Sequence, residues 1–415
     1  MCVVAGDRHT DKPFYERLKT INLDRHISIQ ESNSEDDTAA IQELLEASLD
    51  APFPSEIPPW KILILPLHAG GCFVAFSYSH SIGDGISGNC FHRTFLNALQ
   101  EPGSSTPSAI VQTPDRPLPE PFDTPSRLPI SWSFLLGPLI AALIPAFLAN
   151  LLGMRAAAST TDEGTWTATR MFFKAGELQT KVKVFEIDAS VVGKAVRVSR
   201  EHGAKLTGTI QQIIARALSS QLRDPKITNF VSQTAVNMRK SVGIPEDEFG
   251  EFVSGCYLTH TAQSSNDLAI SLSDDEWAAA RDATNKLALA ATQLADQPIG
   301  LLRYAPSVRN WTMSKLGRER DGSFELSNLG SFDGGAAGHV KISSMVFAQP
   351  GHVVGPPICF NLASVKGGSL VCTVTWQAGA LGIERDEAEF VEGVALEIQN
   401  LFQNLGRERS AATSC

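Results

Sequence analysis

Residues 72–88 read Cys-Phe-Val-Ala-Phe-Ser-Tyr-Ser-His-Ser-Ile-Gly-Asp-Gly-Ile-Ser-Gly. The apolar and aromatic start favours a buried β-strand, and the glycines at 83 and 85 interrupt any helix that would continue it. Beyond the glycines, apolar residues recur at helical spacing and predict a helix (Cys90, Phe91, Phe95, Ala98 and Leu99). His80 is therefore expected where a strand opens into a turn.

His80 is the residue of this stretch that is best suited to chemistry. With an unperturbed pKa of about 6.5, an imidazole can take a proton from a hydroxyl at neutral pH once a partner fixes its orientation. Of the nine histidines, only His80 has an aspartate, Asp84, four positions on. The alternative is a core or turn histidine bonded to the backbone, and the spacing alone leaves both interpretations open.

Length and composition set the broad class. At 415 residues and 43% hydrophobic, the chain favours two domains of ordinary size. The net charge of 35 − 45 = −10 lacks the basic surface of a nucleic-acid-binding protein, so we expect no nucleic-acid partner. The seven cysteines are scattered and never spaced Cys-x-x-Cys, which favours reduced thiols in the cytoplasm and no metal site. No secretory signal is visible at the start.

Strand-like and helix-like segments alternate along the chain. A stripe of apolar residues predicts a helix over 36–49 with Ser34 as its N-cap, a strand is expected at 181–187, and another helix from 207. Residues 371–376 alternate so that Thr373 and Thr375 share a face that could line a polar tunnel. This alternation predicts an α/β architecture, with an N-terminal domain over 1–180 and a C-terminal domain over 181–415.

Residues 131–154 carry no charge, and 134–152 are long enough for a membrane span. Three interpretations compete: buried or tunnel-lining helices, which we favour; peripheral membrane contact; and a true span. If the site is shared by the segments on either side, a span would place them on opposite faces of a bilayer and abolish it.

Residues 58–67 (Pro-Pro-Trp-Lys-Ile-Leu-Ile-Leu-Pro-Leu) followed by 76–88 resemble the fungal alcohol acetyltransferases. These belong to a superfamily with the plant BAHD acyltransferases, chloramphenicol acetyltransferase and peptide-synthetase condensation domains. The resemblance continues, in the family's order, through further short stretches (201–210, 236–239, 327–330 and 364–370). It implies two chloramphenicol-acetyltransferase-like α/β sandwich domains with a tunnel between them, and transfer of an acetyl group from acetyl-CoA, a co-substrate, to a small alcohol.

The resemblance also implies roles for named residues. His80 is expected to take the proton of the acceptor hydroxyl while its oxygen attacks the thioester, and to return that proton to the thiolate. Asp84 is expected to turn away and pair with an arginine, for which Arg239 is the candidate; the alternative for Arg239 is a solvated surface residue. The N–H of Gly85 is expected to face the developing oxyanion, and the alternative is a turn that needs a positive φ.

The Ser-Asn-Leu-Gly element at 327–330 matches the fungal enzymes. We expect it, together with the paired threonines, to contact CoA or substrate; an ordinary loop is the alternative. The residues concerned are Ser327, Asn328, Gly330, Thr373 and Thr375.

Two departures refine the resemblance. Condensation domains usually carry paired histidines, but Ser79 precedes His80, and the plant element Asp-Phe-Gly-Trp-Gly is only loosely echoed at 331–335. We therefore expect a monomeric acyl-CoA enzyme of fungal secondary metabolism or ester formation, cytoplasmic or peripheral to endoplasmic reticulum or lipid droplets. The rival is a catalytically silent relative that binds a hydrophobic metabolite or a membrane.

Family members usually have one more strand and helix before the segment that begins here at Met1, so the first domain is expected to lack them.

Overall fold

The largest sheet of the protein has six strands, all between residues 180 and 377. The computed structural model describes residues 2–7, 10, 13–101, 108–115, 117–143, 160–263, 271–335 and 339–406. The strand order is β10-β9-β11-β12-β13-β8, and β11 runs parallel to β9 and β12 while the other neighbours are antiparallel. Their bounds are β8 Thr180–Ile187, β9 Asn229–Asn237, β10 Val253–Thr261, β11 Phe324–Phe332, β12 Ile358–Val365 and β13 Leu370–Gln377.

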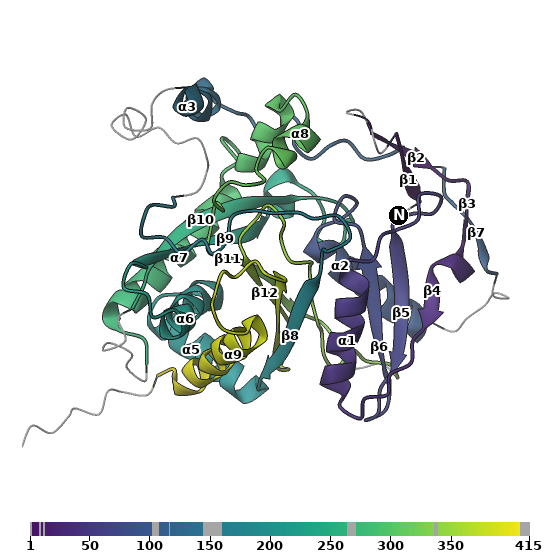
Figure 1. The fold of residues 1–415 in the computed structure, drawn as a ribbon. Helices are drawn as coiled ribbons and strands as arrows, with labels where there is room; N and C mark the ends of the chain where they lie inside the picture. Colours follow the sequence, from purple (N-terminus) through teal and green to yellow (C-terminus); the bar gives the residue numbers. More distant parts are fainter. Residues whose placement is uncertain are drawn as a thin grey trace, which may run out of the picture.

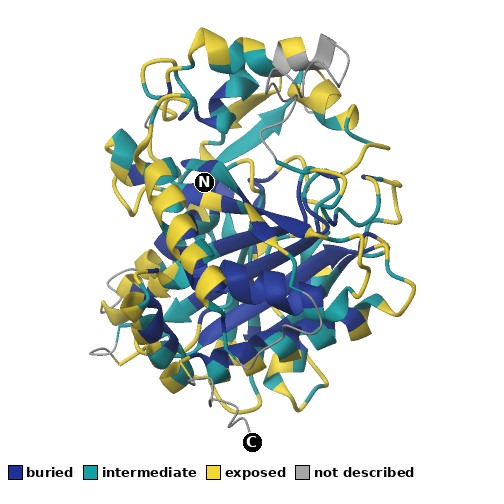
Figure 2. Cartoon of the chain, turned by 90° about the vertical axis from the view of Figure 1, so that its left-hand side faces the viewer, coloured by how far each residue is buried: buried dark blue, intermediate teal, exposed yellow. Residues whose placement is uncertain are grey.

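Helices from the second half of the chain cover one face of this sheet (Figure 1). They are α5 Ala189–Glu201, α6 Leu206–Gln221, α7 Asp274–Thr292 and α9 Glu387–Asn404. Buried residues gather in the strands and in the helix packed on them (Figure 2), and α6 is buried from Gly208 to Ser219. Phe324, Phe360 and Phe390 are completely buried there, so this face holds the main hydrophobic core.

The helix α1, Asp37–Leu49, covers the free edge of the large sheet. The side chains of Gln42, Glu46 and Asp50 accept hydrogen bonds from alternate backbone N–H groups of β8, those of residues 184, 182 and 180. Residues four apart lie on the same face of a helix, and residues two apart have backbone N–H groups on the same edge of a strand. Each of these three side chains therefore meets one N–H group of β8. These three N–H groups, on an edge strand of the sheet, thereby have hydrogen-bond acceptors. The N-cap of α1 is Asp36, which accepts from two backbone N–H groups, and not Ser34 as predicted.

The first part of the chain builds smaller sheets. A three-stranded sheet has the order β4-β5-β6, and α2 packs on it with the Phe91 ring stacked 4.0 Å from the ring of Phe76. Two two-stranded sheets, β1-β2 and β3-β7, complete this part. The bounds are β1 Val3–Gly6, β2 Phe14–Arg17, β3 Thr20–Asn22, β4 Ile27–Ile29, β5 Trp60–Pro66, β6 Cys72–Tyr78, α2 Gly85–Gln100 and β7 Ile110–Gln112.

The uncharged segment begins with α3, Trp132–Leu143 (Figure 1). None of the α3 side chains that the structure describes is buried, and Trp132 is 76% exposed. The predicted burial of this segment is therefore not observed at residues 134–137 and 140, the positions of 134–152 whose side chains are described. The start of α3 is fixed by Ser131, which donates from its backbone and its hydroxyl to Asp296 just before the short helix η3, Pro298–Tyr304. In the part of the chain that is described, no helix combines the length and hydropathy of a membrane span.

Candidate active site

The turn between β6 and α2 carries His80, at the strand end where the sequence places it. Ser79 donates its backbone N–H to the Pro59 carbonyl at 2.8 Å, which continues the pairing of β6 with β5. The Tyr15 hydroxyl donates to the Ser81 carbonyl at 2.7 Å from the other side. The backbone around His80 is therefore fixed, while its side chain stays 65% exposed.

Asp84 points away from His80 and pairs with Arg239. The two side chains are completely buried, and the guanidinium donates to both carboxylate oxygens, at 2.7 and 2.8 Å. Asp84 is also the N-cap of α2, and it accepts from the backbone N–H of Ser87 and of Phe252, each at 3.0 Å. The pair expected from the sequence is present, and the surface alternative for Arg239 is wrong. A buried carboxylate with this many donors holds the shape of the turn.

Residues 250–252 are bonded to the turn through their backbone. The Gly250 carbonyl accepts from the Asp84 N–H at 3.2 Å and from the Ser87 hydroxyl at 3.0 Å, and the Gly250 N–H donates to that hydroxyl. The Phe252 N–H donates to Asp84, and the Arg239 guanidinium lies over the Phe252 ring at 4.8 Å. This segment, which we call the 250–252 clamp, brings the side chain between its two bonded ends to His80.

That side chain is Glu251. Its Oε1 lies 2.8 Å from Nδ1 of His80, and Glu251 is 36% exposed. The hydrogen bond that His80 donates to Glu251 raises the pKa of His80 to about 9, against the opposing effect of desolvation. Sequence reasoning missed Glu251, since it lies 171 residues from His80 in a stretch, Glu-Phe-Gly-Glu-Phe, that matches no catalytic pattern.

Gly85 begins α2 with ordinary backbone geometry. It is not among the glycines with a positive φ, so the turn alternative is wrong. The reason for glycine is close approach, because a Cβ there would lie 2.6 Å from Cδ2 of Leu329 and 3.3 Å from the ring of Phe347. In the described structure no group accepts the Gly85 N–H, which lies in the first turn of a helix, where such donors suit an anion.

The Ser-Asn-Leu-Gly element lies on β11 and meets α2 through Leu329. The Asn328 side chain donates to the Thr207 hydroxyl at 3.2 Å and accepts from the Gly330 N–H at 2.8 Å. Gly330 has a φ of +74°, and the β11 register shifts here. Ser327 is buried. The structure thus brings this element to Gly85, while contact of its residues with CoA stays a prediction.

Comparison with known proteins assigns the chain to a family. A family model described as alcohol acetyltransferase matches residues 3–395. The chain belongs to the alcohol acetyltransferase family. A probable alcohol acetyltransferase, FCK4, of Fusarium pseudograminearum is 25% identical over 98% of this chain and 83% of the relative. Another, crmB of Aspergillus fumigatus, is 23% identical over 90% of this chain and 81% of the relative.

Solved structures confirm the predicted fold class of this alcohol acetyltransferase family member. The trichothecene 15-O-acetyltransferase TRI3 of Fusarium sporotrichioides matches with a TM-score of 0.54 at 14% identity, over 91% of this chain and 78% of that one. SgcC5 of Streptomyces globisporus matches with a TM-score of 0.57 at 16% identity, over 97% and 85%. The fold is thus the α/β fold of these two proteins, with two chloramphenicol-acetyltransferase-like domains. The predicted boundary at 180 and the tunnel stay predictions.

The paired threonines of this family member do not face an open channel. Thr373 and Thr375 lie opposite Val374 as predicted, but both are completely buried. Asn361 on the neighbouring strand donates to the Thr375 hydroxyl at 3.2 Å and to the Thr373 carbonyl at 3.0 Å. In this structure these residues form a buried polar layer of the sheet, and the tunnel-lining position expected for them is not observed.

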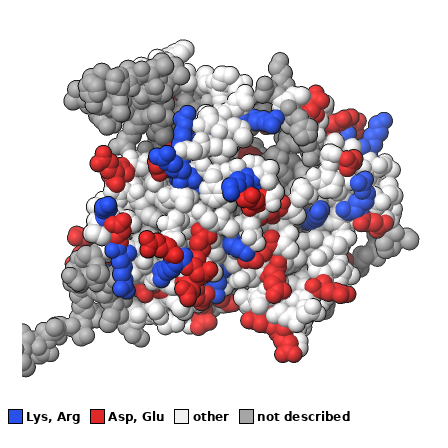
Figure 3. All heavy atoms as spheres, in the orientation of Figure 1, with Lys and Arg blue, Asp and Glu red and all other residues white. Residues whose placement is uncertain are grey.

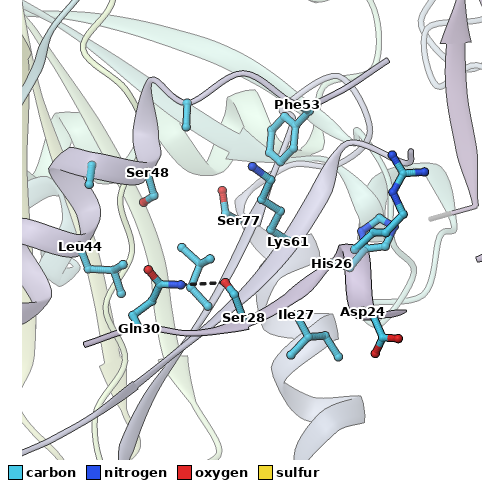
Figure 4. Close-up of a pocket in the computed structure, with 14 residues that line it drawn as sticks. Asp24, His26, Ile27, Ser28, Gln30, Leu44, Ser48, Phe53, Lys61 and Ser77 are labelled. Carbon is cyan, nitrogen blue, oxygen red and sulfur yellow. Dashed lines mark hydrogen bonds between the residues drawn. The ribbon is translucent and has the colours of Figure 1, made fainter. Parts of the chain in front are cut away.

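A hollow of about 360 Å³ lies elsewhere in this family member, between α1 and the small sheet (Figure 4). Leu44 and Ser48 reach it from α1, and Ser28, Lys61 and Ser77 reach it from the strands. None of the predicted site residues lines it. On the face shown in Figure 3, Lys and Arg are interspersed with Asp and Glu, and we see no basic patch there that would mark a CoA phosphate site. No group of metal-ligating side chains occurs among the described residues.

Proposed function

We propose that this family member transfers an acetyl group from acetyl-CoA to the hydroxyl of a small alcohol, with His80 as the general base. The observation that carries the proposal is the placement of His80: it lies on a fixed turn, its Nδ1 is held by Glu251 at 2.8 Å, and α2 begins five residues later with Gly85. A fixed imidazole beside the N–H groups of a helix start suits attack on a thioester, because one group accepts a proton and the other faces negative charge.

The proposed reaction is a direct transfer. Nε2 of His80 takes the proton of the acceptor hydroxyl while the oxygen bonds to the thioester carbonyl carbon. The carbonyl oxygen then carries negative charge, for which the Gly85 N–H is the candidate donor. When the carbon–sulfur bond breaks, the thiolate takes the proton from Nε2, so the products are the ester and free CoA. Ser327, Asn328 and Gly330, in the β11 element whose Leu329 meets Gly85, are the candidate contacts for CoA or the acceptor, and no resident cofactor is required.

The test is incubation of the purified chain with acetyl-CoA and a panel of alcohols, including fungal secondary metabolites and fusel alcohols, with detection of esters and free CoA by mass. We expect ester formation that depends on His80. Binding of hydrophobic metabolites with no ester above the level of His80→Ala would instead support the rival, a catalytically silent acyltransferase-like protein.

One observation favours a further contact, with a membrane surface. The helix α3 exposes Trp132, Leu136 and Ile140, and the sequence carries no charge from 131 to 154. Water-exposed apolar helices of this kind are costly, whereas Trp is enriched at the interface of lipid and water. We propose that the exposed face of α3 lies on a lipid surface. We further propose a monomer that is peripheral to endoplasmic reticulum or lipid droplets.

A further inference from the structure

We propose that Glu251 is a positioning residue for His80, which fixes the hydrogen on Nδ1 and so leaves Nε2 to take the proton of the acceptor. The inference rests on the proposed function of His80 and adds a residue that the His-x-x-x-Asp pattern does not contain. It places the orienting carboxylate in the second half of the chain, and Asp84, four residues from His80, serves Arg239 instead.

The contact with Glu251 selects one nitrogen of the His80 ring. A carboxylate only accepts hydrogen bonds, so the 2.8 Å contact of Oε1 with Nδ1 requires the hydrogen on Nδ1. A neutral imidazole has a single N–H, and its other nitrogen then carries the lone pair. In a side chain that is 65% exposed, loss of this contact would let the ring rotate and let both tautomers form. The contact with Glu251 restricts both the rotation of the ring and the choice of tautomer.

Glu251 is itself held in place by its two neighbours in the chain. The residues on both sides of it are bonded to the turn that carries His80, Gly250 through Ser87 and Asp84, and Phe252 through Asp84. The carboxylate and the imidazole are thus mounted on one hydrogen-bonded frame, whose centre is the buried Asp84–Arg239 pair. Such support keeps a catalytic contact within the fraction of an ångström that proton transfer needs.

Charged and polar groups near His80 set the pKa of its imidazole. Three groups raise the pKa of His80: Glu251 by direct contact, the backbone of His80 itself through a hydrogen bond, and Glu325 on β11 from a greater distance. Asp84 is paired with Arg239 instead. Removal of the Glu251 charge alone should therefore lower the pKa of His80 towards its ordinary value of about 6.5 without removing the smaller effects of the backbone hydrogen bond and of Glu325.

The decisive experiment is ¹⁵N NMR of the full chain with labelled histidine, in which His80→Gln identifies the His80 signals. Wild type is compared with Glu251→Gln, Glu251→Ala and the matched control Glu248→Gln, which removes a charge from the same loop. Above the titration midpoint, we expect wild type and control to show the Nδ1–H tautomer, and Glu251→Ala to show a mixture. The midpoint should fall by at least about one pH unit in both Glu251 variants. Glu251→Gln, which has the same shape and keeps an acceptor, should retain the tautomer.

Turnover provides the second readout. If the protein catalyses acyl transfer, Glu251→Ala should lower kcat by about tenfold or more with little change in KM, and Glu251→Gln should move the pH profile to lower pH. An unchanged tautomer and midpoint in a folded Glu251→Ala variant would overturn the inference whatever the turnover. Absence of turnover in wild type with the expected NMR result would instead overturn the proposed function and leave the His80–Glu251 contact standing.

Discussion

Arg239 holds both carboxylate oxygens of Asp84, through Nη1 at 2.7 Å and Nη2 at 2.8 Å, with both side chains buried. We expect Asp84→Asn or Arg239→Ala to lower the free energy of unfolding by about 3–5 kcal/mol, because each leaves a buried charge without its partner. The double variant should cost less than the sum of the two. Denaturant unfolding measures all three, and strict additivity would disprove the coupling. Arg170→Ala, which breaks the exposed pair with Glu319, is the control and should cost at most about 1 kcal/mol.

Loss of the proposed base should affect activity and not folding. His80→Ala is expected to lower turnover by about 10²-fold or more, as for removal of a general base, with little change in Tm because the side chain is mostly exposed. His68→Ala, at another exposed histidine, serves as the control. A folded His80→Ala variant with wild-type turnover would eliminate the mechanism.

The rate should depend on pH in a direction set by Glu251. Since the pKa of His80 is raised to about 9, the imidazole is protonated at neutral pH and cannot act as a base until it loses that proton. We expect kcat/KM to rise with pH, to reach half its maximum near pH 9 and to level off above it. By linkage, the same contact stabilises the fold below about pH 6.5 and is lost as the pH passes through about 9. A kcat/KM that is constant from pH 7 to about 9.5 would contradict this assignment.

Gly83 has no room for a side chain. A Cβ there would lie 2.8 Å from the ring of Phe249 and 2.9 Å from Cβ of Ser87. Gly83→Ala should therefore lower the free energy of unfolding by about 1–3 kcal/mol and reduce activity, because the turn that carries His80 must shift. Gly193, inside α5, has open space around it, so Gly193→Ala should stabilise the protein by about 0.5–1 kcal/mol. Equal unfolding curves for the two variants would show that the turn is not tightly packed.

The exposed face of α3 makes a separate prediction about membranes. The full chain should float with phosphatidylcholine vesicles in a density gradient, and Trp132→Glu with Leu136→Glu should abolish flotation, because charged residues are costly at a lipid interface. Leu289→Glu, at an exposed leucine of α7, should leave flotation unchanged. Wild type that stays at the bottom of the gradient would refute the lipid contact.

Local patterns were enough to predict the parts of the site that depend on neighbouring residues. The apolar run before His80 and the helical spacing after Gly85 predicted β6 and α2, and alternation in 371–376 predicted the two faces of β13. These follow from the periods of strands and helices. The pairing of Asp84 with Arg239 came from a family resemblance and not from any local signal.

Other features depended on packing between distant segments, which a single sequence does not encode locally. The pattern around His80 gave no indication of Glu251, because the clamp uses backbone atoms of Gly250 and Phe252 that any residue could supply. The glycine at 85 suggested an unusual φ, whereas the cause is the side chain of Leu329. Hydropathy predicted burial of the segment that begins with α3, and no local signal indicated that Trp132, Leu136 and Ile140 would be exposed.

The order of the site residues along the chain has a consequence for synthesis. His80 leaves the ribosome long before Arg239 and Glu251, the latter 171 residues later. A growing chain that ends before residue 239 contains the whole His-x-x-x-Asp-Gly stretch. It lacks both Arg239, which pairs with Asp84 in the turn, and Glu251, which contacts the His80 ring. An unfinished chain therefore holds His80 without the contacts that shape its turn and orient its ring.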